Sequence, residues 1–99
     1  MSEVYLTPEA RADLAEAATW YRQRSAQAAE RFLLAVSASF SRVATNPTAH
    51  PVLDQPTGTR RALLRKFPYR VLYLVDGERV VVFAVMHQRR DDRQWRGRV

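Results

Sequence analysis

The sequence predicts an α+β fold in which an N-terminal strand and a helical hairpin pack on one face of a mainly antiparallel sheet. Three observations predict it. Two segments with helical periodicity follow a short apolar run, three segments rich in β-branched and aromatic residues come next, and 99 residues leave room for only one compact domain. The expected order is therefore β-α-α-β-β-β within a single domain, residues 1–99.

The first two elements are expected to follow each other directly. Val4, Tyr5 and Leu6 form a short apolar run that ends at Thr7-Pro8-Glu9. Threonine is a good helix cap, proline favours the first helical position, and a glutamate suits the positive end of the helix dipole. Apolar residues then recur at helical spacing, so the sequence predicts a helix from Pro8 to about Arg24.

A second helix is predicted from Ser25, which is a cap candidate, to Asn46-Pro47, where the proline ends it. Because few residues join the two helices, they should form an antiparallel hairpin. We interpret Trp20 and Tyr21 as packing residues of this hairpin. One face of the second helix carries Ala29, Phe32, Leu33, Val36, Phe40 and Val43.

Prolines and a glycine predict a loop over residues 45–59, after which three strands are expected at 61–67, 69–75 and 79–86. Asp76-Gly77 between the last two strands indicates a tight hairpin. The last two strands are apolar on both faces, but two helices can cover only one face. We expect a partner chain, the tail or a second copy to cover the other. The residues of this second face that we expect to contact a partner chain are Leu72, Leu74, Val81, Phe83 and Val85.

Charge is concentrated at one end of the chain. Residues 60–99 carry eleven basic against four acidic side chains, whereas residues 1–59 carry five against six. This asymmetry is typical of proteins that bind phosphate or an acidic partner, and it includes a basic tail over residues 89–99. The basic residues are fifteen arginines and one lysine, which suits forked recognition of phosphate or carboxylate.

Several classes of function are not expected from this sequence. It has no cysteine, no glycine-rich phosphate loop and no histidine pair at metal-binding spacing. No window approaches the roughly 20 apolar residues of a membrane helix. We therefore expect a cytoplasmic protein with no metal, no cofactor and no membrane partner.

Five short motifs occur in the order and spacing of a known superfamily. They are Leu6-Thr7-Pro8-Glu9-Ala10, Ala29-Glu30-Arg31-Phe32, Asn46-Pro47, Tyr69-Arg70-Val71-Leu72-Tyr73 and Val85-Met86-His87-Gln88-Arg89-Arg90-Asp91. Together they resemble the RelE/ParE toxin superfamily over residues 3–91. The resemblance implies a type II toxin neutralised by a cognate antitoxin. ParE-like members inhibit DNA gyrase, whereas RelE-like members cleave messenger RNA in the ribosomal A site.

RNA cleavage would need a proton acceptor for the 2′-hydroxyl, positive charge near the phosphate and an acid for the leaving oxygen. Under this alternative the candidate catalytic residues are His87, Arg61, Arg65 and Arg90. Histidine is suited to proton transfer near neutral pH, but at a strand end it can equally hydrogen-bond to the backbone.

A basic surface is expected in either case. Its candidate target-binding residues are Arg70, Arg89, Arg93, Trp95 and Arg96, although Trp95 could stack on a base or pack on the sheet. We favour a ParE-like gyrase inhibitor that is not an enzyme, because the acid–base set is unconvincing. The alternatives are a RelE-like endoribonuclease acting on the ribosome and a non-toxic binding module of the same fold. A homodimer or a hetero-oligomer with the antitoxin is also expected to be possible.

Overall fold

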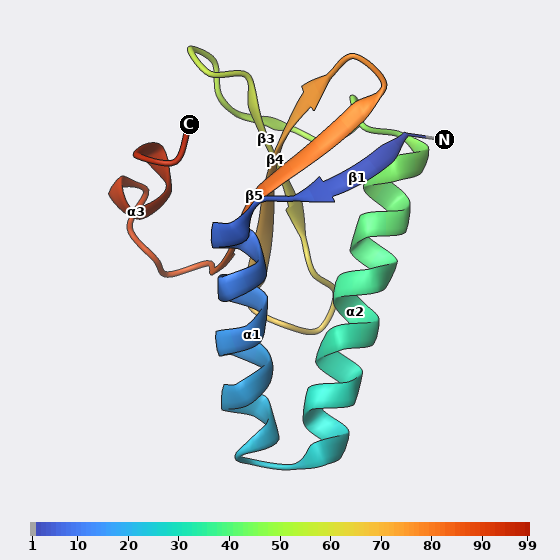
Figure 1. Cartoon of the computed structure of the whole chain (residues 1–99), viewed down its shortest axis with the longest axis vertical. Coiled ribbons are helices and arrows are strands. Elements are labelled where there is room, and N and C mark those ends of the chain that lie inside the picture. Colours follow the sequence, from blue (N-terminus) through green and yellow to red (C-terminus); the bar gives the residue numbers. More distant parts are fainter. Residues whose placement is uncertain (1) are drawn as a thin grey trace.

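One five-stranded sheet, in the order β1-β5-β4-β3-β2, carries a helical hairpin on one face (Figure 1). The structure is a computed structural model, and it describes residues 2–99. No helix in this range is both long and apolar enough to cross a membrane. The elements are β1 (Glu3–Leu6), α1 (Pro8–Arg22), α2 (Ala26–Thr45), β2 (Val52–Asp54), β3 (Thr59–Leu63), β4 (Tyr69–Asp76), β5 (Arg79–His87) and α3 (Arg93–Arg96).

Both helices of the hairpin begin at the predicted caps. The Thr7 hydroxyl accepts a hydrogen bond from the Ala10 amide at 3.1 Å, and the Ser25 hydroxyl accepts one from the Ala28 amide at 2.9 Å. Each bond satisfies a backbone donor that has no partner within its own helix. The helices run antiparallel and meet at a tight connection, as predicted (Figure 1).

The sheet is mainly antiparallel, which confirms the predicted fold class. Only β1 runs parallel to its neighbour, pairing with Arg79–Val82 of β5. The β4–β5 hairpin closes on the pair Asp76 and Arg79, with Gly77 as the first of two central residues at φ +60°. A glycine at this position is typical of a type II′ turn.

Two short elements were not predicted. The strand β2 lies inside the proline-rich segment that the sequence predicted as a loop, and it pairs with Thr59 and Arg60 of β3. The short helix α3 lies in the segment predicted only as a basic tail. Neither is long enough to show a repeating apolar pattern, which is why periodicity did not indicate them.

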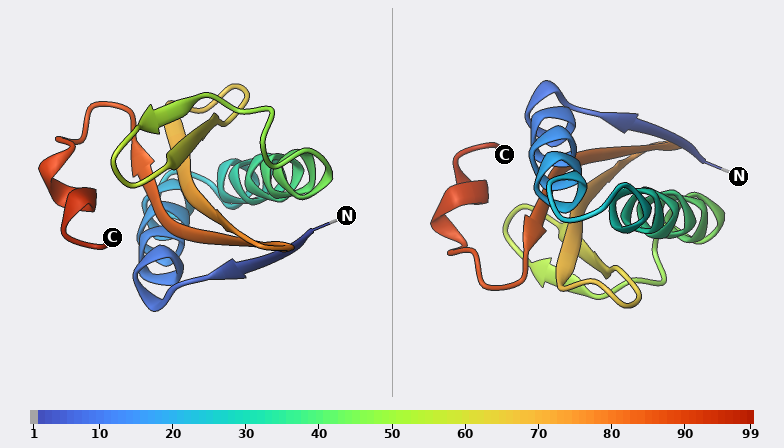
Figure 2. Two further views of the ribbon diagram at one scale, coloured as in Figure 1. Left: turned by 90° about the horizontal axis from the view of Figure 1, so that it is seen from above. Right: turned by 90° about the horizontal axis from the view of Figure 1, so that it is seen from below.

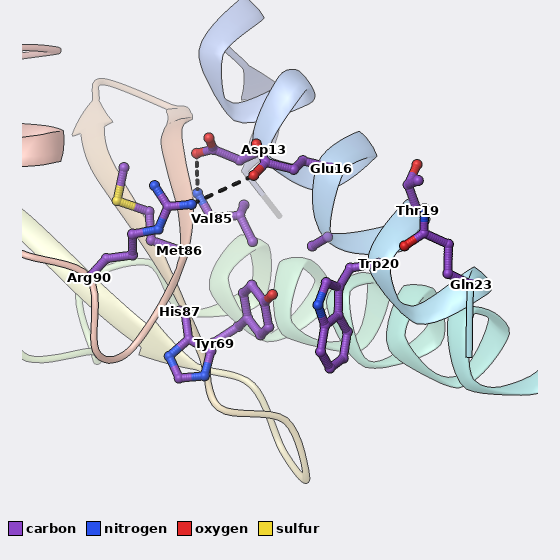
Figure 3. Close-up of a pocket in the computed structure, with 11 residues that line it drawn as sticks. Asp13, Glu16, Thr19, Trp20, Gln23, Tyr69, Val85, Met86, His87 and Arg90 are labelled. Carbon is purple, nitrogen blue, oxygen red and sulfur yellow. Dashed lines mark hydrogen bonds and ion pairs between the residues drawn. The ribbon is translucent and has the colours of Figure 1, made fainter. Parts of the chain in front are cut away.

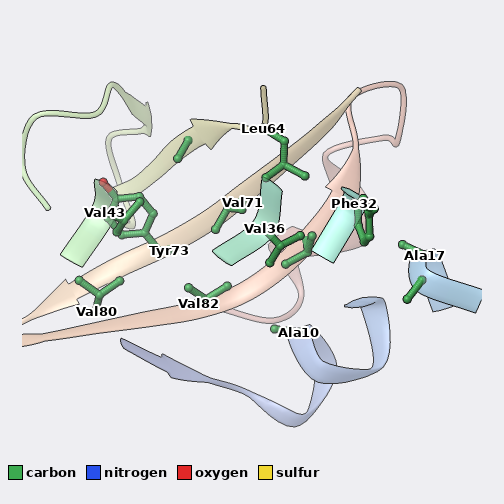
Figure 4. Packing of buried hydrophobic residues seen from close by; sticks show 13 residues of the cluster. Ala10, Ala17, Phe32, Val36, Val43, Leu64, Val71, Tyr73, Val80 and Val82 are labelled. Carbon is green, nitrogen blue, oxygen red and sulfur yellow. The ribbon is translucent and has the colours of Figure 1, made fainter. Parts of the chain in front are cut away.

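The main core lies between the sheet and the two long helices (Figure 4). Phe32 of α2 is fully buried, and its ring lies 5.0 Å from that of Tyr21, 5.5 Å from that of Phe67 and 5.2 Å from that of Tyr69 between centroids. Tyr73 is also fully buried, and its hydroxyl donates to the Pro47 carbonyl at 2.6 Å. Burial raises the pKa of Tyr73 to about 12, so its phenol is a structural donor.

A β-bulge in β5 changes which side chains reach this core. Leu72 pairs with Ala84 and Tyr73 pairs with Val82, which leaves Phe83 as the extra residue. After the bulge the alternation is shifted, so Val85 joins Val82 in the core under the helices. This corrects the prediction that Val85 lies on the second face, because strict alternation through 81, 83 and 85 does not hold across the bulge.

The second face of the sheet is covered in part by the chain's own tail (Figure 2). Trp95 of α3 is fully buried against an apolar cluster whose other members are Leu72, Phe83, Ala84 and Met86. The tail therefore takes up Leu72 and Phe83, two of the predicted partner contacts. Leu74 and Val81 stay half-buried on the same face, near the exposed Tyr5 of β1.

Candidate functional site

Several residues of the predicted basic surface instead fasten the tail to the sheet. Arg70 is only 7% exposed, and its guanidinium donates to the Asp92 carboxylate at 3.0 Å and to the Arg90 carbonyl at 3.1 Å. Asp92 also accepts from the Trp95 indole at 3.1 Å. These contacts correct the assignment of Arg70 to the target-binding surface, and Trp95 follows the alternative in which it packs on the sheet: while the tail is docked, neither side chain can reach a target.

Two further ion pairs hold the tail at both of its sides. Arg96 contacts Asp54 beside the β2–β3 turn at 2.8 Å, and Arg98 contacts Asp13 of α1 at 2.6 and 3.1 Å. A hydrogen bond from Thr57 and then the contact with Arg96 lower the pKa of the Asp54 carboxyl. Asp13 in turn raises the pKa of Arg98. Arg98 and Asp13 are therefore largely buried in this contact, whereas Arg96 keeps 50% of its side chain exposed.

Other basic side chains of the predicted basic surface have no ion pair within residues 2–99. Arg65 and Arg89 are exposed and Arg61 is half-buried. Lys66 belongs to the same set and lies in the β3–β4 connection with φ +67°, a conformation that is uncommon outside glycine. Arg93 is paired with Asp91 at 2.8 Å, but its side chain stays 88% exposed. The accessible part of the predicted basic surface thus includes Arg61, Arg65, Lys66, Arg89, Arg93 and the paired but half-exposed Arg96.

A groove of about 370 Å³ lies between α1 and the end of β5 (Figure 3). Aromatic side chains line it from two elements: Trp20 on α1, which is 47% exposed, and Tyr69 at the start of β4. His87 lies beside Tyr69, with 5.4 Å between the ring centroids. Trp20 therefore differs from its interpretation as a packing residue, whereas Tyr21 does pack in the hairpin core.

Charged and polar groups at the groove are already partly engaged. Arg90 approaches Glu16 at 3.6 Å and donates to the Gln94 side chain at 2.6 Å. The Nδ1 atom of His87 accepts from the Arg89 amide at 3.1 Å, so the proton of a neutral imidazole lies on Nε2. Burial raises the pKa of the Tyr69 hydroxyl, so the hydroxyl keeps its proton and is not available as a base.

The groove unites only half of the predicted catalytic set. His87 and Arg90 both line it. Arg61 lies in β3 opposite Leu72, on the tail side of the sheet, and Arg65 is in the β3–β4 connection; neither lines the groove. Among residues 2–99 there is also no group of three or more histidine, cysteine or acidic side chains placed to hold a metal ion.

Sequence reasoning missed two residues that shape this region. Trp20 lines the groove, and Asp13 fixes both the tail and β5, because its carboxylate also accepts from the Val85 amide at 3.0 Å. Trp20 is next to Tyr21, which packs in the core, on the same helix. The only sequence signal for the exposure of Trp20 is its position just outside the apolar face of that helix. Asp13 could not have been found, because its partners lie far along the chain.

The match to a family model decides the family. The model described as ParE toxin of the type II toxin-antitoxin system, parDE, matches residues 4–92. The chain belongs to the ParE toxin family. This confirms the resemblance to the RelE/ParE superfamily and its closer relation to ParE-like members.

Solved structures share the fold of this ParE family member. A chain of the chromosomal ParDE toxin-antitoxin system from P. aeruginosa is 18% identical with a TM-score of 0.74, over 88% of this chain and 96% of that one. The isolated E. coli RelE toxin is also 18% identical, with a TM-score of 0.58, over 98% and 95%. No curated protein matches the sequence significantly.

Proposed function

We propose that this ParE family member is a toxin that inhibits DNA gyrase, acts in the cytoplasm and is neutralised by a cognate antitoxin. The observation that carries the proposal is the family match over residues 4–92, which spans both long helices and all of the sheet except Glu3. The site geometry is compatible with a toxin that acts by binding, since His87 and Arg90 are not joined by Arg61 and Arg65.

The target surface in this proposal is narrower than the sequence suggested. Arg89 and Arg93 remain exposed, and Arg96 is half exposed although it is paired with Asp54. With Arg61 and Arg65 they would present guanidinium groups to acidic or phosphate-bearing parts of a gyrase–DNA complex. Arg70 and Trp95 would act indirectly, by holding the tail that carries Arg93 and Arg96.

The antitoxin surface in this proposal keeps only part of the predicted set. Leu74 and Val81 are half-buried on the second face and lie near Tyr5, which is 44% exposed. An apolar antitoxin segment would bury these three side chains beside the docked tail. Val81→Glu should weaken antitoxin binding because it places a charge in an apolar contact. Leu34→Glu on the outer side of α2, where Leu34 is 66% exposed, is the matched control.

Expression of the chain alone tests the target. Plasmid supercoiling and protein synthesis are followed together after induction, with and without the product of the adjacent open reading frame. The proposal expects supercoiling to fall first and the adjacent product to restore growth. Cleaved messages and a prompt stop of translation with normal supercoiling would instead show a ribonuclease.

The RelE-like ribonuclease is the second candidate because His87, Tyr69 and Arg90 share one open groove. His87→Ala separates the two candidates. A ribonuclease that uses the imidazole for proton transfer should lose about 10²- to 10⁴-fold in rate. A gyrase inhibitor should retain its toxicity in this variant, and Gln88→Ala on the neighbouring exposed residue controls for local disturbance.

A further inference from the structure

The outer edge of β5 is paired for only half of its length. β1 covers Arg79–Val82, and the Thr7 amide makes a last bond to the Val82 carbonyl at 3.0 Å. From Phe83 onward β5 has no strand neighbour on this side within residues 2–99. The groove between α1 and β5 lies along this unpaired stretch, and Val85, Met86 and His87 form its floor (Figure 3).

Backbone alternation fixes which groups face the groove. The Leu64 amide donates to the Tyr69 carbonyl at 3.0 Å, so Tyr69 directs its backbone groups toward β3. Its cross-strand partner His87 must then direct its own N–H and C=O away from β4. Val85, two residues earlier, does the same, and its amide indeed reaches Asp13 on α1 at 3.0 Å.

Val85 and His87 together direct four backbone groups away from β4, namely two N–H and two C=O groups. Two of these four groups already have a hydrogen-bond partner. The Val85 N–H donates to Asp13, and the His87 C=O accepts from the Arg90 N–H at 2.9 Å. The Val85 C=O and the His87 N–H face the groove without a hydrogen-bond partner in residues 2–99. An unpaired strand edge of this kind is a template for an added strand.

The unbonded Val85 C=O and His87 N–H favour one orientation of the added strand. A parallel neighbour uses the carbonyl of one residue and the amide two residues later, bonding both to a single residue between them. An antiparallel neighbour exchanges both groups of each residue it pairs with, so it would make only half of the bonds to Val85 and His87, because Asp13 and Arg90 already occupy one group on each. An added strand would therefore run parallel to β5, in the direction of β1.

The groove also defines the side chains that such a strand would carry. A residue opposite His87 would point toward the same side as His87 and Tyr69, where Trp20 forms the opposite wall (Figure 3). The Arg24 guanidinium stacks on Trp20 at 3.2 Å from the ring centroid and holds the indole in place. This space fits an aromatic or a large aliphatic side chain.

Charge complementarity indicates the composition of the segment beyond this large apolar residue. A parallel segment would leave the groove past His87, toward the exposed Arg89 and Arg90. Of these, Arg89 has no ion pair within residues 2–99. Acidic residues at the end of the segment would meet them, in keeping with the net charge of +6 on this chain.

We propose that the groove binds an extended segment of a partner protein as a short parallel strand on Val85–His87, with a large apolar side chain between Trp20 and Tyr69 followed by acidic residues. The strand contacts of this proposal do not depend on the gyrase target, because they lie on the backbone edge of β5; of the basic surface, only Arg89 takes part.

A pair of synthetic peptides tests the orientation. The forward probe is acetyl-Thr-Thr-Val-Phe-Asp-Glu-Glu-amide, and the second probe has the same residues in reverse order. Binding to the full chain is measured by calorimetry and by ¹H–¹⁵N spectra. The forward probe should shift the His87 amide and bind at least about tenfold more tightly, the amount expected from two hydrogen bonds. Equal affinity of the two probes, or no binding of the forward probe, would overturn the proposal.

Two variants of one residue separate the backbone from the side chain. His87→Pro removes the open amide, whereas His87→Ala keeps it and removes only the imidazole; the forward probe should bind to the alanine variant and not to the proline variant. Met86 already lies in a strand, so its backbone suits a following proline. Trp20→Ala, on the exposed wall, should also weaken binding at least about fivefold, in line with the loss of one aromatic contact. Undiminished binding by either His87→Pro or Trp20→Ala contradicts the proposal.

Discussion

The two faces of the sheet are held in different ways. The helix face is covered by two long helices whose aromatic and aliphatic side chains pack on the sheet around Phe32 and Tyr73. The tail face is covered by one four-residue helix, one buried indole and three ion pairs to Arg70, Asp54 and Asp13. Apolar packing has no charge that pH can titrate or salt can screen, whereas ion pairs do, so the two covers should respond differently to the same change.

Phe32→Ala should cause the largest loss in the free energy of unfolding and should disrupt the packing of the two long helices on the sheet. Truncating a buried phenylalanine costs about 3–5 kcal/mol, a large part of the roughly 5–15 kcal/mol that stabilises a typical domain. Urea unfolding followed by circular dichroism measures this loss. Leu34→Ala, on the exposed side of the same helix, should stay within about 0.5 kcal/mol of the parent. Similar losses in the two variants would contradict the packing described for α2.

Trp95→Ala should cost less, because the tail can detach while the helix face stays folded. Its cost is therefore capped below the ~3–5 kcal/mol typical of a buried tryptophan. Hydrogen exchange should show rapid exchange of residues 93–99 with continued protection of β4 and β5. A cooperative loss of protection in both regions would mean that the two faces fold as one unit.

Asp13→Ala should have an intermediate effect, because it leaves the Val85 amide and Arg98 without their partner. Losing a partner of buried polar groups costs about 1–3 kcal/mol. Asp13→Asn keeps an acceptor for the amide but loses the charge, so it should retain part of the stability. Equal losses in the two variants, measured by urea unfolding, would show that the charge alone matters.

Acidification should give the smallest effect and should act on the tail face alone. Contacts with Thr57 lower the pKa of Asp54, and those with Trp95 and Arg70 lower the pKa of Asp92. Stability from lowered carboxyl pKa values is present above the ordinary value of about 3.9 and is lost as pH falls through the folded values. The tail should therefore loosen below about pH 4.

Tryptophan fluorescence measures this loosening. The chain has two tryptophans, so Trp20→Phe leaves Trp95 as the single reporter. Its emission should move to longer wavelength at low pH, while the far-UV circular dichroism of the helices persists. An emission that stays unchanged after Asp54 and Asp92 have been protonated would show that apolar packing, and not the ion pairs, holds α3.

The contrast between the faces also explains how much the sequence could predict. Local signals, such as the Thr7 and Ser25 caps and the Asp76-Gly77 turn, act within a few residues and indicated both helices and the hairpin correctly. The apolar pattern of β4 and β5 correctly indicated that a second cover was needed. The tail is that cover over part of this face, one of the possibilities that the sequence had left open.

The candidate site was less predictable because it depends on long-range contacts. Arg70 and Arg96 look like any other arginine in the sequence, and only the fold shows that Asp92 and Asp54 engage them. The groove requires β1 to stop at Leu6 and α1 to lie beside the rest of β5, a three-dimensional arrangement with no local sequence signal. Charge clustering therefore overestimated the free basic surface.

The single extra residue at Phe83 shifts the alternation of side chains between the two faces of β5. Before it, the even-numbered positions 80 and 82 face the helices; after it, the odd-numbered position 85 does so. Two consecutive side chains, Phe83 and Ala84, therefore face the tail together, where a regular strand would offer only one. Strict alternation without the bulge would instead carry Met86 under the helices and turn His87 toward the tail, away from the groove. The bulge at Phe83 thus enlarges the apolar surface that contacts Trp95 and keeps the His87 imidazole at the groove.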